Sequence, residues 1–456
     1  MGIVTLAAVA ALGAFLTLRS RRNPLFLAGA AAWLVLGRSL YMDIVPWRTV
    51  AVVWSIAVTS GDLIFAAAAL GWVYARRRRP MPCVRLAPIW VVLGILIASF
   101  LTLELVLAAV TAGDVHPTMM LATREWFYIP LGYLIALDVL RRFTLDETEQ
   151  YVGVLSAFTV CAFVLYIASA LNVPIYPYEK YLATSYGSTT VVRDFLTIPF
   201  WAGLAWSYYL SQPRKGVWTY VAMAVVACGL LFSYTRSFLA LLVVTTLLAA
   251  GLFLAGRGQR ARGVIVGVAV VTLAVAVLVL GPVVAPAQFG YYGERLGGTA
   301  SVGSVPLDAN AQGRLESFAA ARAAGARVDP YLGTGLPAPA GSLYGQMYIN
   351  ADSDWISIVY HSGLVGILVF ASPFAVALWR GFAGFRREEP SSTAGTLLLT
   401  AMLATVWLLG WRFASAVYMW WPAVSLLSVA LVARAEAVAA PPQRQLRIAR
   451  QRAGRA

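Results

Sequence analysis

The chain has 456 residues, of which 60% are hydrophobic and only 12% are charged. Its mean hydropathy is +0.75, whereas soluble domains are roughly half apolar and a quarter charged. This composition excludes an ordinary soluble domain and predicts an integral membrane protein. The net charge of +15 does not indicate nucleic-acid binding, because the basic residues come in short clusters between apolar runs, as in cytoplasmic loops.

Repeated apolar stretches of roughly 20 residues match the thickness of the hydrocarbon layer of a bilayer. They predict an all-α integral membrane protein with about 13 transmembrane helices, joined in one membrane domain over residues 1–439. In chain order, the expected spans lie near residues 3–18, 24–42, 49–75, 87–111, 126–140, 151–171, 195–210, 216–233, 237–255, 263–285, 354–379, 394–411 and 415–433. The paired spans around Arg236 and Arg412 also fit re-entrant segments.

Arginine-rich connections set the expected orientation, because cytoplasmic loops carry an excess of Lys and Arg. These connections lie at residues 19–22, 76–79, 141–142, 214–215, 257–262 and 380–387. We expect all of them on the cytoplasmic side, with the N-terminus outside and the C-terminus inside. Residues 440–456 then form a basic cytoplasmic tail suited to contact anionic membrane lipid.

This orientation leaves one long extracytoplasmic loop at residues 286–353, far longer than a helix connection needs. Asn310 is a candidate cap for a loop helix, and Pro330 and Gly333 predict turns. We therefore expect a partly helical, largely ordered loop that carries function, with a flexible section near residues 296–309.

Four ionisable residues fall inside expected spans, where charge is expensive and usually marks an ion pair or a polar cavity. They are Arg38, Asp62, Glu104 and Asp138, whose partners are not apparent from the sequence. With three cysteines in or beside spans or cytoplasmic loops and only two histidines, we expect no disulfide, no metal site and no cofactor.

Several arginines depart from the positive-inside trend, because they lie at the outer ends of spans or in the outer loop. They are Arg124, Arg193, Arg236, Arg314 and Arg412. A forked, permanently charged guanidinium suits a phosphate or pyrophosphate ligand. For any single arginine the alternative is a side chain that reaches outer water or pairs with a nearby acid, such as Glu125 or Asp194.

Four segments around the long loop carry a family resemblance. Arg193 is followed by Phe195 and Pro199; residues 233–237 read Ser-Tyr-Thr-Arg-Ser; Gly313-Arg314 and Phe318 precede Pro330-Tyr-Leu-Gly-Thr-Gly335; and Asp352-Ser-Asp-Trp-Ile356 leads to Gly363-Leu-Val-Gly366. In this order the segments resemble the motifs of the O-antigen ligase and O-antigen polymerase superfamily, whose members handle glycans linked to polyprenyl pyrophosphate in the bacterial cytoplasmic membrane. The chain departs from that pattern at Phe200, where the family usually has Asn.

A second departure from the family pattern concerns the residue that would act as the catalytic base. Aligned back from Gly363, the family's histidine falls at Asp352, and the nearest histidine, His361, fits a buried hydrogen-bonded side chain. If the histidine acts as a base in ligases, Asp352 is the candidate substitute, with Asp354 and Glu316 nearby. The alternative is that Asp352 only caps the helix of the next span.

The resemblance implies a metal-independent membrane glycosyltransferase of the GT-C-like kind. Its donor is a polyprenyl-pyrophosphate-linked glycan and its acceptor is a glycan hydroxyl at the outer face of the membrane. Arg236 and Arg314 would stabilise the departing pyrophosphate, and Arg193 and Arg124 would help to bind the donor. Asp352 or Asp354 would orient or deprotonate the acceptor hydroxyl.

Three functions are compatible with this pattern. The missing ligase-type histidine favours a cell-surface polysaccharide polymerase over an O-antigen ligase, which transfers finished glycan to lipid A core or protein. A polysaccharide transporter or flippase is the third, although such proteins commonly show internal repeats and none is visible here.

Overall fold

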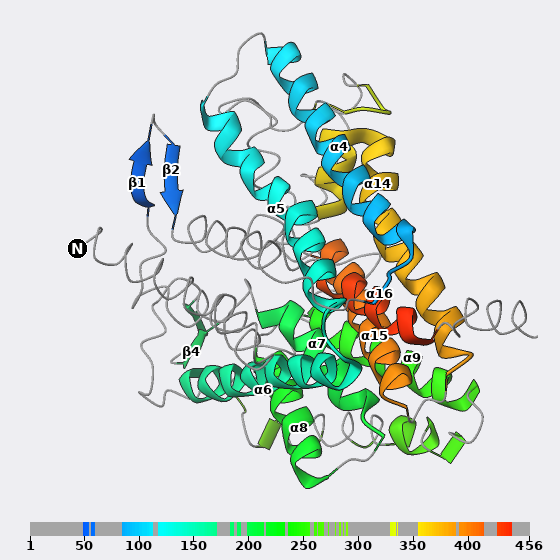
Figure 1. Cartoon of the computed structure of the whole chain (residues 1–456). Coiled ribbons are helices and arrows are strands. Elements are labelled where there is room, and N and C mark those ends of the chain that lie inside the picture. Colours follow the sequence, from blue (N-terminus) through cyan, green and yellow to red (C-terminus); the bar gives the residue numbers. More distant parts are fainter. Residues whose placement is uncertain are drawn as a thin grey trace, which may run out of the picture.

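The computed structural model describes residues 49–53, 56–59, 84–112, 117–170, 183–186, 189–192, 198–213, 216–232, 236–255, 329–333, 335, 354–388, 392–414 and 426–439, and short pieces between residues 260 and 290 (Figure 1). This part of the chain is almost entirely helical. Its main helices are α4 (Pro88–Ala112), α5 (Pro117–Leu140), α6 (Leu145–Ala170), α7 (Ile198–Ser211), α8 (Val217–Phe232), α9 (Arg236–Ala255), α14 (Asp354–Phe385), α15 (Thr393–Ala414) and α16 (Leu427–Ala439).

Within the described ranges, five helices are long and apolar enough to cross a membrane, namely stretches of α4, α6, α9, α14 and α15. Residues 129–140 of α5 and helix α8 are shorter apolar helices. Two of the long helices begin at caps that the sequence supplies. Thr144 and Glu147 exchange hydrogen bonds between backbone N–H and side chain, at 3.1 and 2.7 Å, at the start of α6, and the Ser392 hydroxyl accepts the Gly395 N–H at the start of α15.

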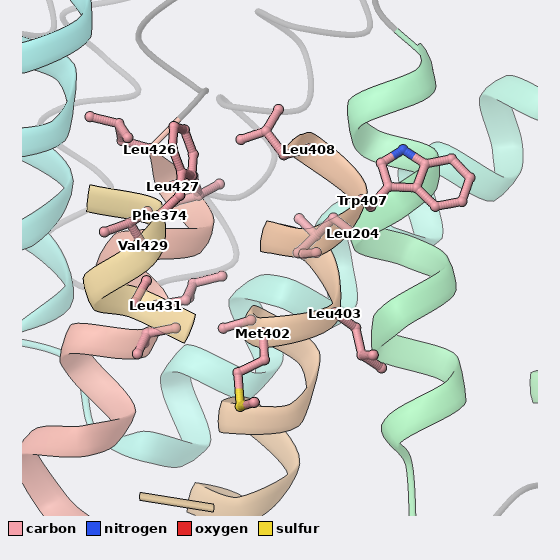
Figure 2. Close-up of a cluster of buried hydrophobic side chains, with 14 of the residues drawn as sticks. Leu204, Phe374, Met402, Leu403, Trp407, Leu408, Leu426, Leu427, Val429 and Leu431 are labelled. Carbon is pink, nitrogen blue, oxygen red and sulfur yellow. The ribbon is translucent and has the colours of Figure 1, made fainter. Parts of the chain in front are cut away.

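Helix α15 lies at the centre of the packing. It contacts α7 and α9 on one side and α14 and α16 on the other. In its most apolar stretch 78% of the residues are buried, against 39% in the corresponding stretches of α4 and α9. Figure 2 shows this arrangement, with Trp407 and Leu403 of α15 toward α7, and Phe374 of α14 and Leu427 of α16 on the opposite side. Gly203 of α7 makes room for the Trp407 ring, in the way that small residues let helices approach closely in membranes.

Helices α4 and α14 pack antiparallel along most of their length. Trp90 near the start of α4 lies against Arg380 near the end of α14. In the middle, the rings of Phe100 and Phe370 meet edge to face at 6.1 Å. Toward the other end, Glu104 lies beside Ser362. This pair therefore has two well-separated ends, and the candidate site lies at the second.

Two short antiparallel hairpins accompany the helices. The first pairs β1 (Thr49–Val53) with β2 (Ile56–Thr59), and the second pairs β3 (Ala183–Tyr186) with β4 (Thr189–Val192). The expected span at residues 49–75 is therefore wrong at its start, where the chain is extended. The physical reason is local, because Thr, Val and Ile dominate both strands and stiff β-branched side chains favour strands.

Some of the expected spans coincide with helices of the structure, and others lie outside the described residues. Those at 87–111, 151–171, 237–255 and 394–411 coincide closely with α4, α6, α9 and α15. The spans at 3–18 and 24–42 lie outside the described residues, as does most of 263–285. At the C-terminal end, α16 begins at Leu427, whereas the sequence predicts a span from 415, and residues 415–425 are outside the described ranges.

Candidate functional site

A tight turn from the long loop is described at residues 329–333. The Asp329 carboxylate accepts the backbone N–H groups of Tyr331 and Leu332, at 2.7 and 3.1 Å, and the Asp329 carbonyl accepts the N–H of Gly333 at 2.8 Å. Gly333 has a φ of 69°, which glycine adopts without steric cost. The turn is therefore fixed by Asp329 and by glycine, in agreement with the turn that Pro330 and Gly333 predict.

This turn is hydrogen-bonded to a break in α14. The N–H groups of Leu364 and Val365 donate to the carbonyls of Pro330 and Tyr331, both at 3.1 Å. In an unbroken helix these two groups would donate to carbonyls four residues earlier. The break lies at Gly363, with φ 58° and ψ −159°, a region almost restricted to glycine.

Close packing at the break also requires glycine. A Cβ atom on Gly363 would lie 2.7 Å from the backbone nitrogen of Leu332 and even closer to the carbonyl group of Tyr331. Two of the four resembling segments, Pro330–Gly335 and Gly363–Gly366, are thus in direct backbone contact. The sequence identifies each segment by its motif, but it does not indicate that the two segments are in contact.

A buried polar pair lies next to the break. Glu104 of α4 is fully buried, and Ser362, which directly precedes Gly363, is 1% exposed. The Ser362 hydroxyl is within reach of the Glu104 carboxyl group, yet neither group completes a well-formed hydrogen bond among the described residues. The sequence marks Glu104 as an expensive intramembrane acid, and the structure adds its neighbour.

The opposite end of α14 is occupied by charge pairs. Glu436 of α16 accepts hydrogen bonds from Arg380 Nε at 2.7 Å and from Trp90 Nε1 at 3.0 Å, and the Arg380 guanidinium lies over the Trp90 ring. At about 1.5 Å per residue, Arg380 lies about 25 Å along the helix from Gly363. The turn and this charged cluster are therefore at opposite ends of α14, separated by roughly the thickness of a hydrocarbon layer.

Further charged residues lie at the same end of the molecule as the cluster of Trp90, Arg380 and Glu436. Asp138, whose partners the sequence leaves open, pairs with both Arg141 and Arg142. Arg434 is 2% exposed and donates from Nε to the Phe143 carbonyl at 2.9 Å. Burial lowers the pKa of the Arg434 guanidinium, and the nearby Glu147 carboxylate opposes that shift. Three stretches that the sequence assigns to the cytoplasmic side, at 141–142, at 380–387 and after residue 433, thus have residues at one end of the helix packing.

The backbone around Arg236 is also described. Arg236 is the first residue of α9, and a helix N-terminus favours anions through its free N–H groups. The preceding helix ends at Phe232, whose carbonyl accepts a hydrogen bond from the Tyr166 hydroxyl at 2.9 Å. One turn into α9, Leu241 packs on Gly410 of α15. The helix ends on both sides of the Ser-Tyr-Thr-Arg-Ser segment are therefore anchored to neighbouring helices.

The side chains of the candidate site residues all lie outside the described part of the chain, so their mutual distances are not described. Arg124 lies within α5 and Asp354 is the first residue of α14, but their side chains, like that of Arg236, are outside the described part. Arg193, Arg314 and Asp352 lie wholly outside the described residues. The described part of the site therefore consists of the backbone of the turn, the break in α14 and the start of α9, together with the buried Glu104 and Ser362. Sequence reasoning missed Asp329, although Asp before Pro is a signal for a turn.

These observations define the class as a helical membrane protein with several spans. Comparison with known proteins adds no narrower class, because no protein-family model matches the chain and no curated protein matches its sequence significantly.

Proposed function

We propose that this protein transfers a glycan from polyprenyl pyrophosphate to a sugar hydroxyl at the outer face of the bacterial cytoplasmic membrane, as a cell-surface polysaccharide polymerase. The observation that carries this proposal is the contact between the Pro330–Gly335 turn and Gly363. Both segments resemble motifs of one enzyme superfamily. Their mutual packing gives a physical reason for glycine at residue 363, and the positive φ within the turn gives one at residue 333.

The proposed orientation rests on the basic stretches of the chain, and their packing at one end of the helices is consistent with it. The turn and the Arg380 cluster lie at opposite ends of α14, and the cluster's end carries Arg141, Arg142 and Arg434. Since basic residues next to spans favour the cytoplasm, the turn belongs on the outer side. A lipid-linked glycan presented in the outer leaflet would then meet the loop that carries Arg314 and the turn.

In the proposed reaction, the acceptor oxygen forms a bond to the anomeric carbon of the donor glycan. The bond from that carbon to the pyrophosphate oxygen breaks, and its electron pair leaves with the polyprenyl pyrophosphate. Arg236 and Arg314 stabilise the negative charge that develops there, assisted by the N-terminus of α9. The proton of the acceptor hydroxyl passes to Asp352 or Asp354.

The test is a transfer assay with the purified protein in lipid vesicles that contain purified lipid-linked repeat units. A polymerase lengthens these units into a ladder of products and releases polyprenyl pyrophosphate. A single transfer that occurs only when lipid A core is added would identify a ligase instead. Movement of intact donor between leaflets without a new glycosidic bond would identify a transporter and refute the proposed activity.

A further inference from the structure

The buried pair of Glu104 and Ser362 has a free-energy cost that no contact among the described residues offsets. Both carboxyl oxygens of Glu104 and the hydroxyl oxygen of Ser362 are buried without a hydrogen-bond partner among the described residues. An unpaired ionised carboxyl in the apolar part of a membrane protein is expensive, and an unpaired neutral polar group still loses its hydrogen bonds to water. Such groups usually mark function.

The place of the pair suggests what it does. Ser362 is the last residue before the break in α14, and the small Gly366 packs against its Cβ atom. On the other side of the break, the N–H groups of Leu364 and Val365 hold the loop turn. Any interaction that fixes Ser362 therefore also fixes the angle at which residues 354–362 leave the rest of α14.

We propose that Glu104 is a positioning residue that, as the neutral acid, donates a hydrogen bond to the Ser362 hydroxyl. This bond ties α4 to the break in α14 and keeps the turn seated on Leu364 and Val365. It also fixes the direction of residues 354–362, which begin with the candidate acceptor-binding Asp354. Only this last consequence rests on the proposed glycan transfer.

The neutral acid is the form that suits the surroundings. One turn before Glu104, α4 carries the buried apolar residues Phe100 and Leu101, and among the described residues no cation pairs with Glu104. A carboxylic acid has one O–H donor, and a hydroxyl can accept it. An amide in the same place can also donate to the hydroxyl, whereas a leucine cannot, and this difference makes the proposal testable.

Hydrogen–deuterium exchange measures the seating of the turn directly, without any assay of activity. The amides of Leu364 and Val365 are protected by carbonyls of the turn. In Glu104→Leu, loss of one buried hydrogen bond should speed exchange at these two amides by about tenfold. Glu104→Gln should exchange at nearly the wild-type rate. Thr102→Val is the matched control. Among the described residues the Thr102 hydroxyl donates only to the Ala98 carbonyl of its own helix, so its loss should change nothing at the turn.

A transfer assay adds the functional consequence. If the proposed glycan transfer holds, Glu104→Leu should lower the turnover by about tenfold while Glu104→Gln retains it. Wild-type exchange in Glu104→Leu, or exchange in Glu104→Gln as fast as in Glu104→Leu, would overturn the positioning role. If the wild-type protein transfers no glycan, the proposed function fails, but the exchange result still decides the role of Glu104.

Discussion

Gly363 is the residue at which the loop and the membrane helix depend on each other most directly. Its φ of 58° favours glycine, and the space where a Cβ would lie is filled by the backbone of the turn. Gly363→Ala should lower the free energy of unfolding by about 1–3 kcal/mol, since the variant must either strain the backbone or release the turn. Thermal unfolding in detergent micelles measures this change.

Gly251 provides the matched control for that substitution. It lies in α9, and apart from its chain neighbours and the adjacent backbone of its own helix, no atom lies within 4 Å of the position that a Cβ atom would take there. Gly251→Ala should therefore be neutral or slightly stabilising, because alanine favours helices. Equal unfolding temperatures for Gly363→Ala and the wild-type protein would contradict the fit described at the break.

Asp352 is the candidate base that departs from the superfamily pattern. If it takes the acceptor proton, Asp352→Asn should cut turnover strongly, although asparagine keeps the size and can still cap a helix. If it is only a cap, Asp352→Asn should retain turnover, while Asp352→Leu should lower stability by about 1 kcal/mol. Steady-state transfer rates and unfolding temperatures of the two variants separate these cases. Near-normal turnover in Asp352→Asn would move the base to Asp354 or Glu316.

At the scale of elements, Glu436 joins three helices at the end of the molecule opposite to the turn. It accepts hydrogen bonds from Trp90 of α4 and from Arg380 of α14. Glu436→Ala should lower the free energy of unfolding by about 1–3 kcal/mol, because it leaves a buried indole N–H and a guanidinium without their acceptor. Thermal unfolding of Glu436→Ala, Trp90→Phe and the double variant should show a smaller combined effect than the sum. Full additivity would mean that α4 and α16 are not coupled through the hydrogen bond between Trp90 and Glu436.

The elements also show what the sequence can and cannot predict. Helices α4, α9 and α15 match their expected spans within a few residues, because long apolar runs and capping residues act locally. The hairpin of residues 49–59 lies in an apolar stretch whose β-branched residues suit a strand as well as a membrane helix. The contact between the turn and Gly363 joins residues about thirty positions apart through backbone atoms, so side-chain patterns carry no trace of it.

The same limit applies to the candidate site. The sequence identifies Glu104 as a costly buried acid, but its neighbour Ser362 comes from packing of α4 against α14. It identifies Arg236 by motif, and the structure adds that this residue begins α9. The roles of Arg193, Arg314 and Asp352 remain predictions from the resemblance.

For the whole molecule, the proposed orientation is tested at the two ends of α14. Tyr331 in the turn is 63% exposed, and Arg386 lies just beyond the other end of the helix and is exposed as well. In a background with the three native cysteines replaced by alanine, Tyr331→Cys should react with a membrane-impermeant thiol reagent in intact cells. Arg386→Cys should react only after the cells are permeabilised. The reverse pattern would invert the topology.

The central claim is that outer arginines stabilise a departing pyrophosphate, and the most direct test is the transfer rate of Arg236→Ala and Arg314→Ala in vesicles that contain the lipid-linked donor. Loss of one charged donor to a developing anion costs on the order of 3 kcal/mol, so each variant should transfer glycan more than a hundredfold more slowly, and lysine should restore little of the rate. Arg386→Ala, at the opposite end of α14, is the control and should keep the wild-type rate. Wild-type transfer by both Arg236→Ala and Arg314→Ala, in proteins that insert and accumulate normally, would contradict the account.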